Sequence, residues 1–254
     1  MVTAMPDRDA TWRESWVAET GSTNTDLMDA ARTGEPEGAV LVADHQTAGR
    51  GRLDRRWEAP PNASLLVSVL LRPSIPLGRA HLVTLVVALA AADACGDVAG
   101  VRPALKWPND LVVDDAKLGG ILAESLLDGS TLAAVVVGMG LNVNWPPKMP
   151  AELASSATAL NHLIGHDVDR RVLLDRFLDR LEGWYGRLTE TDALLGEYRA
   201  RSATVGRAVR VELADSSYEG TAVDVTAEGH LVVETADGQR RTVAAGDAIH
   251  LRPR

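Results

Sequence analysis

The fold is decided by ALKWPNDLVVDDAKLGGILAESLL, residues 104–127. Its apolar and β-branched runs predict a strand, a turn at Asp114-Asp115 and a returning strand. Proline has no N–H to donate to a strand ladder, so Pro108 predicts a bulge at that point. The bulge should turn Asn109 and Asp110 in a new direction, away from the line of the preceding strand.

Similar patterns extend on both sides of this segment. Apolar, β-branched runs predict strands, and Leu and Val at helical spacing predict helices. The expected elements are strands at 39–47, 64–72 and 133–144, and helices at 22–34, 79–95 and 169–200. The first helix should be capped by Ser22 or Thr23 and should end at Gly34.

The character of the chain changes near residue 204. Short β runs then alternate with turn signals such as Glu228-Gly229 and Asp237-Gly238, which suggests about five strands in roughly fifty residues. A small β-barrel is the expected result. We therefore divide the chain into a loose tail (1–14), a main domain (15–203) and a small C-terminal barrel (204–254).

Composition excludes several classes of protein. A formal net charge of −9 argues against a general nucleic-acid binder. The longest apolar run, Leu82–Ala92, is about half of the roughly 20 residues that a membrane span needs. The N-terminus is polar and carries no signal-like apolar core, so a cytoplasmic protein is expected. A single cysteine, Cys95, rules out a disulfide framework or a Cys-rich zinc site.

The segment HQTAGRGRLDRRWE, residues 45–58, holds four arginines and is called the arginine loop below. A solvated turn or a basic patch for nucleic acid would be the ordinary interpretation. The functional interpretation is a flap that encloses a phosphate, because glycine lets backbone approach a ligand and guanidinium groups bind phosphate or carboxylate oxygens in pairs. No Lys-Ser/Thr follows the glycines, so it is not a Walker loop.

Lysine is rare in this chain: only Lys106, Lys117 and Lys148 are found among 26 basic residues. A lysine is therefore more informative here than in an average sequence, because an ammonium and a guanidinium are not interchangeable. Lys117 stands before Gly119-Gly120, where bare backbone lets another molecule lie close. Glu124 then interrupts an otherwise apolar strand.

The segment GMGLNVN places glycines and asparagines on one strand face. Gly138, Gly140, Asn142 and Asn144 recur at period two, which suits a flat ligand resting on the sheet. Together with the arginine loop, this describes a sheet floor with amide and ammonium groups under a cationic flap. Neither a His or Cys metal-ligand set nor a convincing Ser-His-Asp arrangement is evident. Charge stabilisation at a phosphate, as in phosphoryl or nucleotidyl transfer, is the chemistry that fits.

Five motifs in order resemble the catalytic domain of biotin–protein ligases: STNTD, QTAGRGR with RRW, KWPNDL, KLGGILAE and GMGLNVN, between Ser22 and Asn144. The last fifty residues resemble the small SH3-like C-terminal domain of that family. The resemblance implies an α+β fold with a mixed sheet flanked by helices. It also implies a two-step reaction, in which biotin and MgATP give biotinyl-5′-adenylate and a lysine of a biotin carboxyl carrier domain then takes the biotin.

The resemblance assigns roles to individual residues. It implies catalytic roles for Lys117, Arg52 and Asp110. The implied biotin contacts are Ser22, Thr23, Asn24, Gln46, Gly49, Arg50, Gly51, Arg52, Lys117, Gly119 and Gly120. The implied nucleotide contacts are Arg52, Arg55, Trp57, Lys106, Asn109, Lys117 and Asn142. Protein metal ligands and a bound prosthetic group are not expected.

The chain departs from the family pattern in two places. Leu53 and Asp54 stand where the family loop usually has a small or basic residue and a glycine. The tryptophan that packs on adenine in some relatives has no evident counterpart in Ala157–Leu160. About twenty residues precede GSTN, too few for a DNA-binding module, so we expect a monofunctional enzyme, monomeric or weakly dimeric, without nucleic-acid or membrane partners.

Two rival functions stay open at this point. A lipoate–protein ligase shares the implied fold and chemistry, although a dithiolane ring would want a more apolar pocket than Ser22, Thr23, Asn24 and Gln46 provide. A non-catalytic biotin-sensing regulator is the rival from another class, and the expected lack of a DNA-binding module argues against it.

Overall fold

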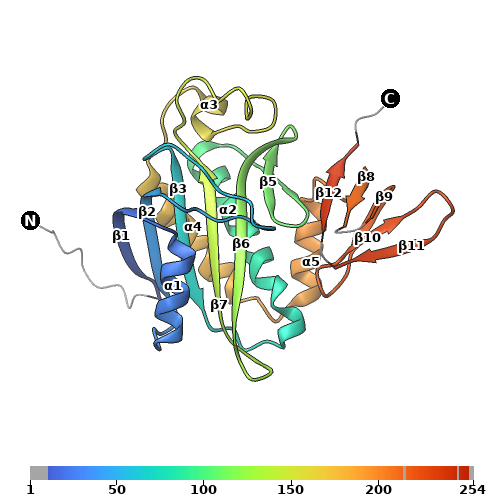
Figure 1. Cartoon of the computed structure of the whole chain (residues 1–254), viewed down its shortest axis with the longest axis horizontal. Coiled ribbons are helices and arrows are strands. Elements are labelled where there is room, and N and C mark those ends of the chain that lie inside the picture. The colour runs from blue at the N-terminus through green and yellow to red at the C-terminus, as the bar shows by residue number, and fades with distance from the viewer. Residues whose placement is uncertain (1–10, 214–215, 245, 252–254) are drawn as a thin grey trace, which may run out of the picture.

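The computed structural model describes residues 11–213, 216–244 and 246–251. It contains two sheets, and most of the helices lie beside the first of them (Figure 1). Residues 1–10 of the predicted tail, and residues 252–254 at the other end, lie outside the described residues. The strand orders are β1-β2-β3-β7-β6-β5-β4 and β11-β10-β9-β8-β12.

The first sheet is mixed, as the resemblance implied. Its strands are β1 (Arg13–Thr20), β2 (Ala39–Gln46), β3 (Ser64–Leu71), β4 (Ala104–Lys106), β5 (Asp110–Val113), β6 (Ala116–Asp128) and β7 (Thr131–Asn142). Only β1 and β2 pair in parallel; the other neighbours are antiparallel. The arginine loop joins β2 to β3, as predicted, and its Trp57 lies against Gly120 of β6 and Gly140 of β7.

The hairpin at the centre of the opening segment is confirmed. β5 and β6 are joined by Asp114 and Asp115, whose φ values of 49° and 66° suit a two-residue hairpin turn. Pro108 stands in the short connection between β4 and β5, so the chain reverses there and Asp110 begins a new antiparallel strand. The predicted change of direction is therefore a second hairpin.

Strand β1 was not predicted. It begins at Arg13, inside the predicted tail, and its sequence RESWVAET is mostly polar. The strand lies at the edge of the sheet, where only one side is paired and little of it is buried. The segment is a strand because it pairs with β2, and its own sequence has no apolar alternation from which a strand could be predicted.

Alternate side chains of the central strands belong to two separate hydrophobic cores. On β3, Val69 joins the core under helix α2 (His81–Ala99), whereas Leu70 joins the core under helix α1 (Thr23–Arg32). Successive side chains of a strand point to opposite faces, so the two helices cover opposite faces of the sheet. Helix α4 (Arg170–Tyr185) packs on α2, and the remaining helices are α3 (Leu160–Ile164) and α5 (Thr191–Ala200).

The segment Leu77–Ala99, which contains α2, is long and apolar enough to cross a membrane by length and composition alone. In the folded chain, however, 67% of its apolar window is buried inside the protein. Its contacts with α4, α5 and the first sheet are those of the central helix of a core.

The second sheet follows α5 and is antiparallel throughout. Its strands are β8 (Ala208–Glu212), β9 (Ser217–Val225), β10 (Leu231–Glu234), β11 (Arg240–Val243) and β12 (Asp247–His250). The predicted division at residue 204 falls between α5 and β8. The second sheet contacts the first domain through hydrogen bonds, among them Trp107 Nε1 to the carbonyl of Gly229 (2.9 Å).

Candidate active site

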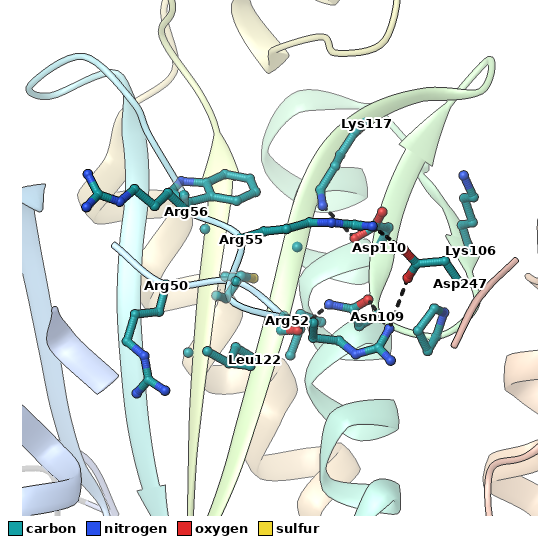
Figure 2. Close-up of a pocket in the computed structure, with 18 of the residues that line it drawn as sticks. Arg50, Arg52, Arg55, Arg56, Lys106, Asn109, Asp110, Lys117, Leu122 and Asp247 are labelled. Carbon is teal, nitrogen blue, oxygen red and sulfur yellow. Dashed lines mark hydrogen bonds and ion pairs between the residues drawn. The ribbon is translucent and has the colours of Figure 1, made fainter. Parts of the chain in front are cut away.

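A cavity of about 340 Å³ lies where the arginine loop, strands β5–β7 and strand β12 meet (Figure 2). The predicted site residues that line it are Ser22, Thr23, Asn24, Gln46, Arg50, Gly51, Arg52, Arg55, Trp57, Lys106, Asn109, Asp110, Lys117 and Gly120. These residues come from separate parts of the chain, and the fold brings them into one place. The arrangement of a sheet floor beneath a cationic loop is therefore present.

Three predicted contacts do not line the cavity. Gly119 packs against Leu141 and Leu111 on the core side of β6. Gly49 lies against the backbone of Trp57 inside the arginine loop. The Asn142 amide donates to the carbonyl of Thr158 (3.0 Å) and is buried, so its hydrogen bonds hold a neighbouring loop.

Other lining residues were not predicted from the sequence. On the floor these include Leu122 and Met139, and the second sheet adds Glu212, Asp247, Ala248 and Ile249. Leu122 shares its strand face with Gly120, so the pattern that predicts β6 also indicates it, whereas Met139 belongs to the core under α2. The residues of the second sheet carry no such signal, because their position depends on how the two domains pack.

A polar cluster made by Thr23, Asn24, Gln46 and Ser68 lies at one end of the cavity, and all of its members except Ser68 line the cavity. Gln46 Oε1 accepts from the backbone N–H of Thr23 (2.8 Å) and from Thr23 Oγ1 (3.0 Å). Thr23 Oγ1 lies 2.7 Å from Ser68 Oγ, and Ser68 Oγ donates to Asn24 Oδ1 (2.7 Å). The cluster sits at the start of α1 and is almost completely buried at Thr23, Asn24 and Ser68. It offers amide and hydroxyl groups in fixed positions to a polar ligand.

The glycines of β7 make room for side chains of the chain itself. A Cβ on Gly138 would lie 2.2 Å from Asn24 Oδ1, and one on Gly140 would lie 2.3 Å from Trp57 Cε2. The strand face of Gly138 and Gly140, which was expected to lie under a flat ligand, is thus covered by the Asn24 amide and the Trp57 indole. Trp57 Nε1 is buried without a hydrogen-bond partner in the described residues.

The charged centre of the cavity is Lys117 with Asp110. Lys117 Nζ lies 2.7 Å from Asp110 Oδ1 and 5.5 Å from the centre of the Trp57 ring. The adjacent Asn109 fixes its own amide by donating to the carbonyl of Ile121 (2.6 Å). An ammonium and a carboxylate therefore stand together at the cavity wall, with an amide oxygen beside them.

Carboxylates pair with three of the four loop arginines. Arg50 Nη1 is 2.9 Å from Glu124 Oε1, Arg52 Nη1 is 3.7 Å from Asp247 Oδ1, and Arg55 also pairs with Asp247. Figure 2 shows Arg50 pointing away from Lys117, while Arg52 and Arg55 extend toward Asp247. Burial lowers the pKa of the Arg52 guanidinium, and the nearby carboxylates oppose this shift. These ion pairs offset the mutual repulsion of the arginines in the loop.

The loop itself forms a small hairpin. Gly51 N–H donates to the carbonyl of Arg55 (2.7 Å), and Leu53 and Asp54 occupy its turn with φ values of 54° and 57°. The turn therefore needs a left-handed backbone at two residues with side chains, one of them where the family usually has glycine. Leu53 is 64% exposed at the tip.

The described residues contain no group of three or more His, Cys, Asp or Glu side chains that could hold a metal ion. The cations at the cavity are instead side chains: Lys106, Lys117 and the loop arginines. Such groups suit a ligand that carries carboxylate and phosphate charges.

Two protein families match this chain. Residues 16–142 match the biotin/lipoate A/B protein ligase family, and residues 204–251 match the biotin protein ligase C-terminal domain. The chain is 39% identical to a biotin–[acetyl-CoA-carboxylase] ligase of Mycobacterium tuberculosis, over 95% of this chain and 90% of that protein. It is 32% identical to the enzyme of the same name from Paracoccus denitrificans, over 91% of this chain and 94% of that protein.

A solved structure has the same fold. The biotin protein ligase from Aquifex aeolicus, in complex with biotin and ATP, superimposes with a TM-score of 0.79 at 29% identity, over 94% of this chain and 99% of that one. The chain therefore belongs to the biotin/lipoate A/B protein ligase family, as a biotin protein ligase.

Proposed function

We propose that this cavity activates biotin with MgATP and that Lys117, Arg52 and Asp110 act in the two steps of the reaction. One observation carries the proposal: a polar cluster (Thr23, Asn24, Gln46) and a paired ammonium (Lys117) open into the same cavity. The amides and hydroxyls of the cluster match the donors and acceptors of a ureido ring. The ammonium matches the carboxylate at the other end of biotin.

In the first step, a carboxylate oxygen of biotin attacks the α-phosphorus of ATP. The bond from that phosphorus to the bridging oxygen breaks, and pyrophosphate leaves with its Mg²⁺. Negative charge gathers between the two reacting groups, and Lys117 and Arg52 reduce its cost. The arginine loop keeps water away from the mixed anhydride that forms.

In the second step, the amine of a carrier-domain lysine attacks the biotinyl carbonyl carbon. The C–O bond to AMP breaks, AMP leaves, and an amide remains. The amine must be neutral to attack, and Asp110 is the carboxylate that receives its proton. The partner is a biotin carboxyl carrier domain, the location is the cytoplasm, and the enzyme works as a monomer or weak homodimer.

Transfer to a purified carrier domain tests the function directly. The protein, biotin and MgATP should biotinylate the domain at one lysine and release AMP and pyrophosphate. Calorimetry with biotin and with lipoate compares the ligands, and biotin should bind much more tightly because a dithiolane leaves the buried polar groups unpaired. Preference for lipoate, or binding of biotin without transfer, would overturn the proposal.

A further inference from the structure

Two polar residues support the site from behind without lining the cavity: Ser68 on β3 and Glu124 on β6. Ser68 is fully buried, and the side chain of Glu124 is only 25% exposed. A carboxylate in such a position must be compensated by nearby donors. The reaction as proposed above uses neither residue.

Glu124 has two sets of partners. Its Oε2 accepts from Asn24 Nδ2 (3.0 Å), and both its oxygens lie within 3.0 Å of Arg50 Nη1. One carboxylate therefore touches the polar cluster and the arginine loop at the same time. Asn24 Nδ2 also donates to the carbonyl of Leu122 (3.1 Å), so both protons of that amide are used.

These contacts complete a circuit of hydrogen bonds. The circuit runs from Gln46 through Thr23, Ser68, Asn24 and Glu124 to Arg50. Its two ends, Gln46 and Arg50, both belong to the arginine loop, four residues apart. The polar cluster and the stem of the loop are thus parts of one hydrogen-bonded unit.

We propose that Glu124 is a positioning residue that fixes the Asn24 amide for biotin and ties the arginine loop to an occupied pocket. This inference rests on the proposed function. The carboxylate can only accept, so it fixes which end of the Asn24 amide faces Ser68 and which faces β6. A ligand that pulls on Asn24 then changes the forces on Arg50 through one further side chain, Glu124.

Glu124→Gln tests the proposal because it keeps the size of the side chain and removes the charge. Its amide nitrogen would face Asn24 Nδ2 or Arg50 as a second donor. The KM and the Kd for biotin should each rise about tenfold or more, as expected when a charge-assisted hydrogen bond is lost. The kcat at saturating biotin should stay within about twofold, because Glu124 contacts Asn24 and Arg50, whereas the reacting carboxylate is proposed to lie at Lys117. Trypsin should cleave after Arg50 and Arg52 faster than in the wild type.

Two further variants separate the possible roles. Ser68→Ala interrupts the circuit inside the cluster, so it should raise the KM for biotin about fivefold and leave loop cleavage unchanged. Asp128→Asn, at the exposed end of the same strand as Glu124, should change neither value. A purely structural role for Glu124 would lower the melting temperature and the active fraction at an unchanged KM.

The outcomes are distinct. An unchanged biotin affinity in Glu124→Gln overturns the positioning role, and an unchanged cleavage rate overturns the link to the loop. Wild-type protein that binds biotin without transferring it would overturn the proposed function instead, while the comparison of Kd values would still test Glu124.

Discussion

Removing the ammonium at the charged centre gives the sharpest prediction from this structure. Lys117→Ala deletes a charge that lies 2.7 Å from Asp110 and within cation–π distance of Trp57. The loss of one transition-state charge contact is worth about 3 kcal/mol, or roughly a hundredfold in the rate of adenylate formation. Stability should change little, by about 1 kcal/mol at most, because the side chains of the pair are 38% and 22% exposed.

The assay is pyrophosphate release with biotin and ATP, followed at saturating substrates, with the melting temperature measured in parallel. Lys148→Ala is a matched control, since Lys148 is an exposed lysine that does not line the cavity. Lys117→Arg should remain strongly impaired, because a planar guanidinium cannot place its charge where the ammonium lies. A Lys117→Ala enzyme within tenfold of wild-type turnover would refute the assigned role.

Three further predictions concern the loop, the floor and two histidines at the domain contact, His81 beside Gly229 and His250 beside Asp115. Arg52→Gly should still form the adenylate but release it, which a blot would detect as biotin on added albumin; unlabelled albumin would contradict the lid role. Gly138→Ala should weaken biotin binding about tenfold in calorimetry, because the added Cβ would lie 2.2 Å from Asn24 Oδ1; unchanged affinity would show that the Asn24 amide can move freely. Burial lowers the pKa of His81 and His250 below the ordinary value near 6.5. The unfolded chain therefore takes up protons first as the pH falls, and stability that is present above pH ~6.5 is lost below it. Between pH ~7 and ~5 the melting temperature of the wild type should drop more than that of a His81→Asn/His250→Asn double variant. Equal drops would show that these two histidines do not cause the pH dependence of stability.

Much of the fold could be predicted because its signals are local. Apolar runs mark β2, β3 and β7, Asp114-Asp115 marks the central hairpin, and α2 repeats Leu and Val at helical spacing. Strand β1 lacks such a signal, since its residues are polar and its pairing with β2 alone makes it a strand. Edge strands of this kind depend on a neighbour that lies far away in sequence.

The candidate site was predictable to the extent that its residues fall in short motifs. Lys117 and the arginines stand out by residue type, whereas Ser68 resembles any small residue in a buried strand. Asp247 joins the site only because the second sheet packs beside the arginine loop. Asn142 shares a strand face with Gly140, but its amide turns to the carbonyl of Thr158. The periodicity of the sequence predicts on which face of a strand a side chain lies. The hydrogen-bond partner of that side chain depends on tertiary packing.

The ion pairs of the arginine loop affect how nucleotide binding should respond to ionic strength. Arg50, Arg52 and Arg55 already hold carboxylates, so an arriving triphosphate replaces one anion with another at Arg52 and Arg55. Free guanidinium groups would instead carry loosely held counterions, whose release makes affinity fall steeply with added salt. An exchange of partners releases few such ions, and the freed Asp247 is left close to the phosphates that displaced it. ATP affinity should therefore change less with salt than the number of loop arginines suggests, and discrimination among nucleotides should depend on how well each replaces Asp247.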